Sequence, residues 1–460
     1  MIDAPPAPTV VDAVPRPRPA ARERLGDAAV GAVLAYWATY LTWGTGGREP
    51  HRLSYLAALV LVAFAVVQPW RSVSPRLLLW ANALGLAAGL VVLTAPTGLE
   101  GRDEAASYAI VGQLVVLVAA WAKDPIRRLA VVAAVLVFGI LQLSMGWLAW
   151  WGGADPSNPF IGTFYWHNQA GIALAAAAVA AYGCLLLLDG PLRTLSWVVA
   201  PLAAAGTVVS TSRASMGGLV LGLVVVLALG AWQRAWRASA RVLVAAAAGW
   251  VTSLVLVSPV FFASADGGGV SPLAGTSARG AAEPLSGNTD ARLYSWDLAV
   301  DVFREWPLTG AGFHGFKSAS SQLVGEPQQF AHSHNGFLQA AADGGLALAL
   351  PVWIGALAFA WIVLRRVVRE GRALEPALLV ALPVLGLLVL HAGMDFDWSY
   401  PALACATGLV AAIFLTAPSV DESTHSRRAG AAVALTLLVL AAVGAWGGGL
   451  DLNATVGGGA

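Results

Sequence analysis

Long apolar runs alternate with short polar segments along most of this chain. Runs of about 20 apolar residues recur, and this is the length that an α-helix needs to cross the hydrocarbon core of a bilayer. Because such a helix satisfies all its own backbone hydrogen bonds, the runs predict membrane-spanning helices. The pattern predicts thirteen spans, with twelve or fourteen also compatible, near residues 28–44, 53–70, 77–95, 105–122, 129–150, 169–189, 194–210, 214–231, 242–258, 341–364, 376–394, 398–417 and 429–447.

Composition indicates the same fold class, an all-α, polytopic transmembrane bundle of about 12–14 spans. The chain is 58% hydrophobic and only 12% charged, far from a soluble domain. Its two cysteines, Cys184 and Cys405, fall inside predicted spans, which excludes a disulfide framework and a cysteine-based metal site. A net charge of +1 gives no indication of a nucleic acid partner.

The polar segments divide the chain into five parts. Residues 1–27 are rich in Pro, Ala and Arg, which predicts a disordered cytoplasmic tail and not a cleaved signal. Two sets of transmembrane helices, 28–258 and 334–447, flank one long loop, 259–333, in which short amphipathic helices are expected. Residues 448–460 are Gly-rich and predict a flexible tail.

Lys and Arg are distributed unevenly between alternate loops. With residues 1–27 inside, most of the 27 Lys and Arg fall on the cytoplasmic side, where basic residues are retained. The loop 259–333 is therefore predicted to face outward. Four segments that are far apart in sequence then reach this outer side, which predicts a shared external pocket: residues 162–168, 210–213, the long loop and 391–401.

Arg213 lies in a short hairpin between two apolar runs, where its charge must be solvated, paired or bound to an anion. A snorkelling arginine is one interpretation. Ser212 and the neighbouring hydroxyls favour another, an anion site at the start of a helix. Arg292 begins an amphipathic helix predicted over 290–306, with Trp296 on its apolar face. It fits either an anion site or a surface arginine paired with Asp290 or a headgroup.

His332 and His334 come just before Asn335, a good N-cap residue. The dipole at a helix start disfavours imidazolium, so a neutral histidine suited to a general base is expected here. The alternatives are a weak His-x-His metal site and an ordinary loop histidine.

His391 and Asp395 fall at the outer end of a span, where an acid is costly unless it is paired. Arg213 or Arg292 could be the partner of Asp395, and solvation at the helix end is the alternative. His167 and Asn168 precede another span and could simply cap it.

Taken in order, these segments resemble the O-antigen ligase and O-antigen polymerase superfamily over about residues 130–417. The His332 to Gln339 segment, with Asp343-Gly344-Gly345, is the most specific match. Ala214 stands where the family usually has Gly, and the span at 429–447 exceeds the twelve usual for the ligases. The other matching elements are Gly162-x-Phe164-x-x-x-Asn168, Ser212-Arg213, Arg292 to Trp296 with Pro307 to Gly312, and His391-x-x-x-Asp395-Phe396.

The resemblance implies a multi-pass enzyme of the bacterial cytoplasmic membrane with its active site facing the periplasm. Such enzymes move a glycan from polyprenyl (undecaprenyl) diphosphate to an acceptor hydroxyl, with inversion and without a cofactor or metal. The implied roles are His334 as base and Arg213 and Arg292 on the diphosphate. The supporting residues are His332, Asn335, His391, Asp395, His167, Asn168, Ser212 and Trp296.

Several functions share these motifs, and the sequence leaves them open. A ligase to a glycolipid, a repeat-unit polysaccharide polymerase and a protein O-oligosaccharyltransferase all fit. A transporter for a lipid-linked sugar fits less well, because transporters tend to place charged groups near the membrane midplane.

Overall fold

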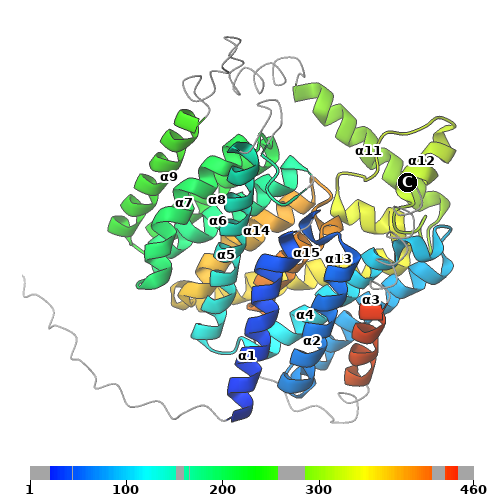
Figure 1. Cartoon of the computed structure of the whole chain (residues 1–460), viewed down its shortest axis with the longest axis horizontal. Coiled ribbons are helices and arrows are strands. Elements are labelled where there is room, and N and C mark those ends of the chain that lie inside the picture. Colours follow the sequence, from blue (N-terminus) through cyan, green and yellow to red (C-terminus); the bar gives the residue numbers. More distant parts are fainter. Residues whose placement is uncertain are drawn as a thin grey trace, which may run out of the picture.

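The protein is a bundle of helices, as expected (Figure 1). The computed structural model describes residues 21–43, 45–151, 160–164, 166–256, 285–416 and 430–443, and no strand occurs among them. Nine of the described helices are long and apolar enough to cross a membrane, so the chain is a multi-pass membrane protein. They are α2 (Pro50–Val67), α3 (Pro75–Thr94), α4 (Arg102–Trp121), α5 (Pro125–Trp151), α6 (His167–Leu187), α7 (Pro191–Val209), α8 (Arg213–Trp232), α9 (Trp236–Leu256) and α13 (Gly336–Glu370).

The remaining expected spans also coincide with helices. Three are shorter apolar helices: α14 (Pro376–Ala392), α15 (Pro401–Ala412) and the segment Gly430–Val443. The first expected span, 28–44, coincides with α1 (Ala21–Tyr36), which continues as a π-helical turn over Trp37–Leu41. The expected tails at 1–20 and 448–460 lie outside the described residues.

Helix α1 begins at Ala21, inside the segment expected to be a disordered tail. Arg127, at the start of α5, lies 2.7 Å from Glu23 and 2.8 Å from Asp27. These ion pairs hold the first turns of α1 against the neighbouring helix. The predicted tail, 1–27, is therefore too long at its C-terminal end. The ion-pair partner, Arg127, lies on another helix and cannot be identified from the sequence of the tail.

Helix α6 lies at the centre of the bundle, with almost all of its residues buried. It packs against α5, α7, α8, α9 and α14. Its sequence is mainly Ala with interspersed Gly, and small side chains let neighbouring helices approach closely. At Gly171 an added Cβ would lie 2.6 Å from Ser210 Oγ, so this glycine permits the close approach of the α7–α8 turn.

The long loop docks onto a break in α13. At Gly345 the helix adopts a φ of 54° and a ψ of −153°, which releases backbone groups from the helical ladder. Leu346 and Ala347 N–H donate to the carbonyls of Pro307 and Leu308, and the loop in turn donates N–H groups to the carbonyls of Ala342 and Asp343. The Pro307 to Gly312 element is therefore a structural clamp, which replaces the missing helical hydrogen bonds.

Two helices of the long loop are described, α11 (Leu285–Glu305) and α12 (Phe316–Val324). The predicted amphipathic helix 290–306 is present as the greater part of α11. Its buried stripe is Ser295, Leu298, Ala299 and Val302, packed toward α12 and α13. Trp296, expected on the apolar face, lies beside this stripe and is only half-buried.

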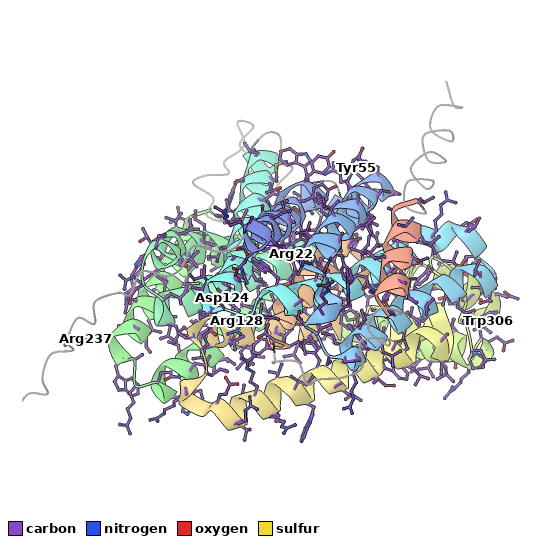
Figure 2. All side chains as sticks on the ribbon, turned by 90° about the horizontal axis from the view of Figure 1, so that it is seen from below. Arg22, Tyr55, Asp124, Arg128, Arg237 and Trp306 are labelled. Carbon is purple, nitrogen blue, oxygen red and sulfur yellow. The ribbon has the colours of Figure 1, made fainter. Side chains whose placement is uncertain are left out.

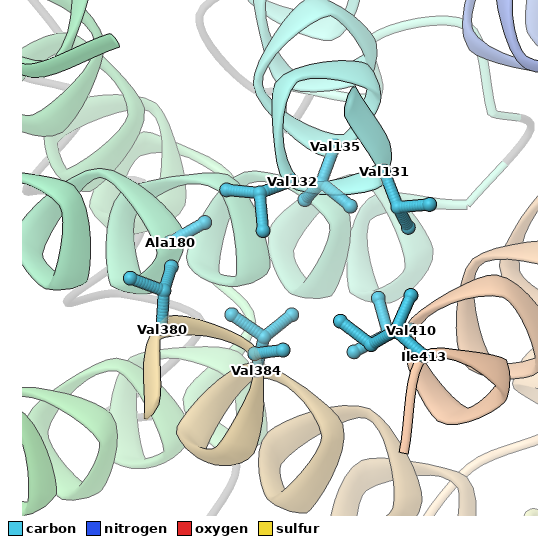
Figure 3. Close-up of a pocket in the computed structure, with 9 residues that line it drawn as sticks. Val131, Val132, Val135, Ala180, Val380, Val384, Val410 and Ile413 are labelled. Carbon is cyan, nitrogen blue, oxygen red and sulfur yellow. The ribbon is translucent and has the colours of Figure 1, made fainter. Parts of the chain in front are cut away.

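The transmembrane helices leave a small apolar hollow between them (Figure 3). Its lining is wholly aliphatic, so it offers no hydrogen-bonding group to a polar ligand. The lining comes from α5, α6, α14 and α15 with the following turn: Val131, Val132, Val135, Ala180, Val380, Ala381, Val384, Val410 and Ile413. A site for polar chemistry is therefore expected at the helix ends and not in this hollow.

His314 ties the loop to the start of α4, and its titration should be visible in stability. Its Nε2 lies 3.4 Å from Asp103 and 3.9 Å from Glu104, and the hydrogen bond with Asp103 raises the pKa of His314 to about 9. A raised folded-state pKa gives stability that is complete below the ordinary value of about 6.5 and is lost as pH rises through about 9. We expect His314→Gln to flatten the fall in Tm between pH 7 and pH 10.

His51 is the matched control for this experiment, since it is an exposed histidine beside Glu49. His51→Gln should leave the pH dependence of Tm unchanged. A His314→Gln protein whose Tm falls with pH as steeply as that of the wild type would contradict the proposed stabilising role of the His314–Asp103 pair.

Candidate functional site

Helix ends from distant parts of the chain meet at one site. The starts of α6, α8, α13 and α15 and the end of α14 contribute side chains to one hydrogen-bonded network, together with α11 of the long loop. In Figure 2, α13 runs from the side of Trp306 to the side of Arg237, and the network lies at its Trp306 end, where α13 begins. The four segments expected to share a pocket are therefore neighbours.

Asp395 is the centre of this network. Its side chain is fully buried, and its carboxylate accepts from Asn168 Nδ2 at 2.8 Å and lies 3.5 Å from Arg292 Nη2. Burial raises the pKa of Asp395, but the hydrogen bond and charge of His334 and the charges of His391 and Arg292 outweigh it and hold the pKa at about 2. Asp395 is therefore an ionised carboxylate, and Arg292 is the arginine that pairs with it.

His334 is held by the same carboxylate. Its Nδ1 lies 3.3 Å from Asp395 Oδ1, and because a carboxylate only accepts hydrogen bonds, Nδ1 carries the proton. In the neutral imidazole, Nε2 of His334 then has the free lone pair. The side chain is 22% exposed, and the described residues offer Nε2 no hydrogen-bond partner.

The backbone at His334 is constrained from two sides. Its φ is 52°, a left-handed conformation that is uncommon for a side chain with a Cβ and is concentrated at functional sites. Trp296 Nε1 donates to the His334 carbonyl at 3.2 Å, and Ser295 Oγ donates to the Ser333 carbonyl at 2.8 Å. Trp296 thus connects α11 to the histidine.

Asn335 is the N-cap of α13, as predicted. Its side-chain oxygen accepts from Phe337 N and Leu338 N, and its Nδ2 donates to the Gly393 carbonyl. It therefore satisfies the first amides of α13 and fixes this helix start against the end of α14.

A second histidine–carboxylate pair lies beside the first. His391 Nδ1 is 2.6 Å from Asp397 Oδ2, and Gln169 Nε2 donates to Asp397 Oδ1 at 3.2 Å. His391 Nε2 lies 3.3 Å from Ser215 Oγ. Both ring nitrogens of His391 are thus engaged within the protein.

The start of α8 is attached to this second pair. Ser212 is its N-cap, and Ser212 Oγ lies 2.8 Å from Ser215 Oγ, which donates to the Asn168 carbonyl. Arg213, the first residue of α8, is exposed and makes no ion pair with the described residues. The start of α8 thus lies beside the site network, while no described residue forms an ion pair with the Arg213 guanidinium.

His167 and Asn168 do not cap α6, contrary to the alternative left open by the sequence. The N-cap is Trp166, without a side-chain cap, and both residues lie in the first turn. Asn168 binds Asp395, whereas the His167 ring lies against Trp166, with a centroid distance of 5.6 Å.

Arg48 was not among the predicted site residues. Its Nη2 lies 3.1 Å from His332 Nε2, its Nε donates to the Ser399 carbonyl, and its guanidinium lies 4.3 Å from the centroid of the Tyr400 ring. Few arginines were predicted on the outer side, and this small number could have drawn attention to Arg48. Asp397 and Gln169 were also not among the predicted site residues. Each lies within two positions of a residue that was predicted, Asp395 and Asn168 respectively.

Residues 197–353 match the family model described as O-antigen ligase. Over these residues the chain is similar to the O-antigen ligases. This family comprises enzymes, the O-antigen ligases and polymerases, which transfer lipid-linked glycans. No curated protein matches the chain.

The matched segment runs from α7 into α13 and contains Arg213, Arg292, His332 and His334. Asp395, which holds Arg292 and His334, lies beyond the matched residues. The site is therefore assembled from the matched domain and from helices on both sides of it in sequence.

Proposed function

We propose that this O-antigen ligase family protein transfers a glycan from a polyprenyl diphosphate to an acceptor hydroxyl outside the cytoplasmic membrane. The observation that carries the proposal is the pairing of His334 and Arg292 through one buried carboxylate, Asp395. It brings a candidate base and a cation together at one site. Family membership supports the lipid-linked donor.

The reaction requires a base and charge neutralisation at different atoms. The acceptor hydroxyl attacks the anomeric carbon, the bond from that carbon to the diphosphate oxygen breaks, and the diphosphate leaves with the bonding electrons. His334 Nε2 takes the hydroxyl proton, while Asp395 stabilises the resulting imidazolium through Nδ1–H. A single displacement of this kind inverts the anomeric configuration.

Two arginines are placed to stabilise the leaving group in this proposal. Arg292 is 20% exposed and keeps donors beyond the one that faces Asp395. Arg213 is exposed at the start of α8, where the helix dipole also favours an anion. Fixed donors aimed at developing negative charge are often the largest single contribution to catalysis.

The proposed orientation follows the distribution of arginines. Arg193, Arg234, Arg237 and Arg366 lie at helix ends opposite the site, and basic residues are retained on the cytoplasmic side. The site then faces the periplasm or the exterior. In this proposal, the N-terminal tail lies in the cytoplasm. The loop 259–333 joins the two sets of transmembrane helices, 28–258 and 334–447, and faces outward.

Transfer should be independent of added metal. Possible ligands already face guanidinium groups, since His332 Nε2 contacts Arg48 and Asp395 pairs with Arg292. Among the described residues, no group of three or more His, Cys, Asp or Glu side chains is arranged to hold a metal ion. Glycan transfer by the reconstituted protein should persist in EDTA, and a loss reversed by Zn²⁺ or Mg²⁺ would contradict this prediction.

Reconstitution in vesicles tests the function as a whole. Purified protein supplied with polyprenyl diphosphate-linked glycan should release polyprenyl diphosphate and form a glycosylated acceptor. A glycolipid, a second lipid-linked repeat unit and a hydroxyl-bearing protein are the three acceptors to compare, because they separate ligase, polymerase and protein O-oligosaccharyltransferase. Movement of intact lipid-linked glycan between leaflets, without a new glycosidic bond, would instead indicate a transporter.

A further inference from the structure

The two neighbouring histidines of the site have opposite hydrogen-bonding arrangements. His334 uses Nδ1 toward a carboxylate, whereas His332 uses Nε2 toward the Arg48 guanidinium, at 3.1 Å. A guanidinium has only donors, so Nε2 of His332 must accept and cannot carry a proton. The proton of His332 is therefore on Nδ1.

Arg48 is itself held in place. It donates through Nε to the Ser399 carbonyl at 3.2 Å, and its guanidinium lies over the Tyr400 ring. The His332 ring stacks on Phe396, with a centroid distance of 4.5 Å and an interplanar angle of 16°. Both partners are thus fixed by residues of the segment that carries Asp395, and neither can turn away without losing these contacts.

The charges around His332 also disfavour its protonation. It faces Arg48 from the loop before α2, His314 from the long loop, His334 on its own segment and Asp395 from the turn before α15. Asp395 is the only acid among these groups, and it is already engaged by Arg292 and His334. Burial and then Arg48 lower the pKa of His332 to about 3.

We propose that Arg48 is a positioning residue that keeps His332 neutral, with its Nδ1–H presented to a substrate oxygen. His334 is then the only histidine of the pair that takes up a proton. No acceptor for Nδ1 of His332 lies within the described part of the protein, which leaves this donor available to a ligand. The substrate part of this inference rests on the proposed glycan transfer, and the assignment of the tautomer does not.

Nitrogen NMR of the full chain labelled with ¹⁵N-histidine tests the tautomer directly. The His332 signals are assigned by their loss in His332→Asn. Between about pH 5 and pH 8, we expect one protonated and one unprotonated nitrogen, with Nδ1 protonated and no titration. Protonation of His332 within this range, or a proton on Nε2, would overturn the proposal without any reference to activity.

Arg48→Met tests the cause, because methionine keeps an apolar stem and removes the charge and donors. Without the guanidinium that faces Nε2, the tautomer of His332 should no longer be fixed, and its titration midpoint should rise, although burial still lowers it. Arg304→Met is the matched control, since Arg304 is exposed and its one ion pair among the described residues is with Asp301. An Arg48→Met protein in which His332 keeps both the wild-type midpoint and the Nδ1–H tautomer alone would refute the role of Arg48.

Two substitutions of His332 test the donor in transfer. The amide nitrogen of Asn lies near the position of Nδ1, whereas that of Gln lies near Nε2. We expect His332→Asn to retain about tenfold more single-turnover transfer than His332→Gln, the effect of one hydrogen bond. Equal rates would overturn the substrate contact while leaving the NMR assignment intact. Failure of transfer in the wild type would instead reject the proposed function.

Discussion

His334→Ala should lower the turnover of glycan transfer about 10²- to 10⁴-fold, the usual contribution of a general base. Donor binding should remain nearly intact, because His334 Nε2 acts on the acceptor proton and Nδ1 serves only Asp395. Single-turnover transfer and donor affinity, measured on the same preparation, separate the two effects.

The control for this substitution is His51→Ala, which removes an exposed imidazole outside the site network. It should transfer at the wild-type rate. Near-normal transfer by His334→Ala would remove the assignment of His334 as base. His332→Ala should be milder than His334→Ala, because His332 is proposed to donate a hydrogen bond and not to take up a proton.

Arg292→Ala should weaken donor binding and lower turnover by about 10²- to 10³-fold, the loss typical of one fixed donor to developing negative charge. Removing Arg292 also leaves Asp395 with His334, Asn168 and the Phe396 amide as its partners among the described residues. Arg292→Lys should keep the charge beside Asp395 and preserve Tm, yet rescue transfer poorly, because an ammonium cannot reproduce the bidentate fork. Donor affinity, turnover and Tm of both variants are the measurements.

Arg304→Ala is the matched control on α11, since Arg304 is 73% exposed and paired with Asp301. Arg213→Ala provides a second comparison. Arg213 makes no ion pair with the described residues, so its loss should leave Tm unchanged while donor affinity falls. Unchanged donor affinity in both Arg213→Ala and Arg292→Ala would refute the diphosphate clamp.

The structure also distinguishes parts of the motifs that bind from parts that hold the fold. Gly310 and Gly345 have positive φ values, and a Cβ at either would collide with backbone of the other segment. The two glycines permit the backbone contacts that complete the broken helix α13. A resemblance in sequence gives both kinds of residue equal weight, whereas hydrogen bonding separates them.

The sequence by itself determined the fold class and the broad position of the site. Apolar runs of bilayer length predict helices in any context, because lipid offers the backbone no other partners. The polar residues confined to a few loops then indicated where chemistry was possible, and Asn335 was correctly identified as a helix cap from local signals alone.

Tertiary structure alone decided the pairings. Asp395 could have been paired with Arg213 or Arg292, and only the packing of α11 against the start of α13 selects Arg292. The contact of Arg48 with His332 spans 284 positions in sequence, beyond the reach of any local pattern. The state of each histidine depends on which ring nitrogen meets a donor or an acceptor, and this is fixed only when distant helix ends meet.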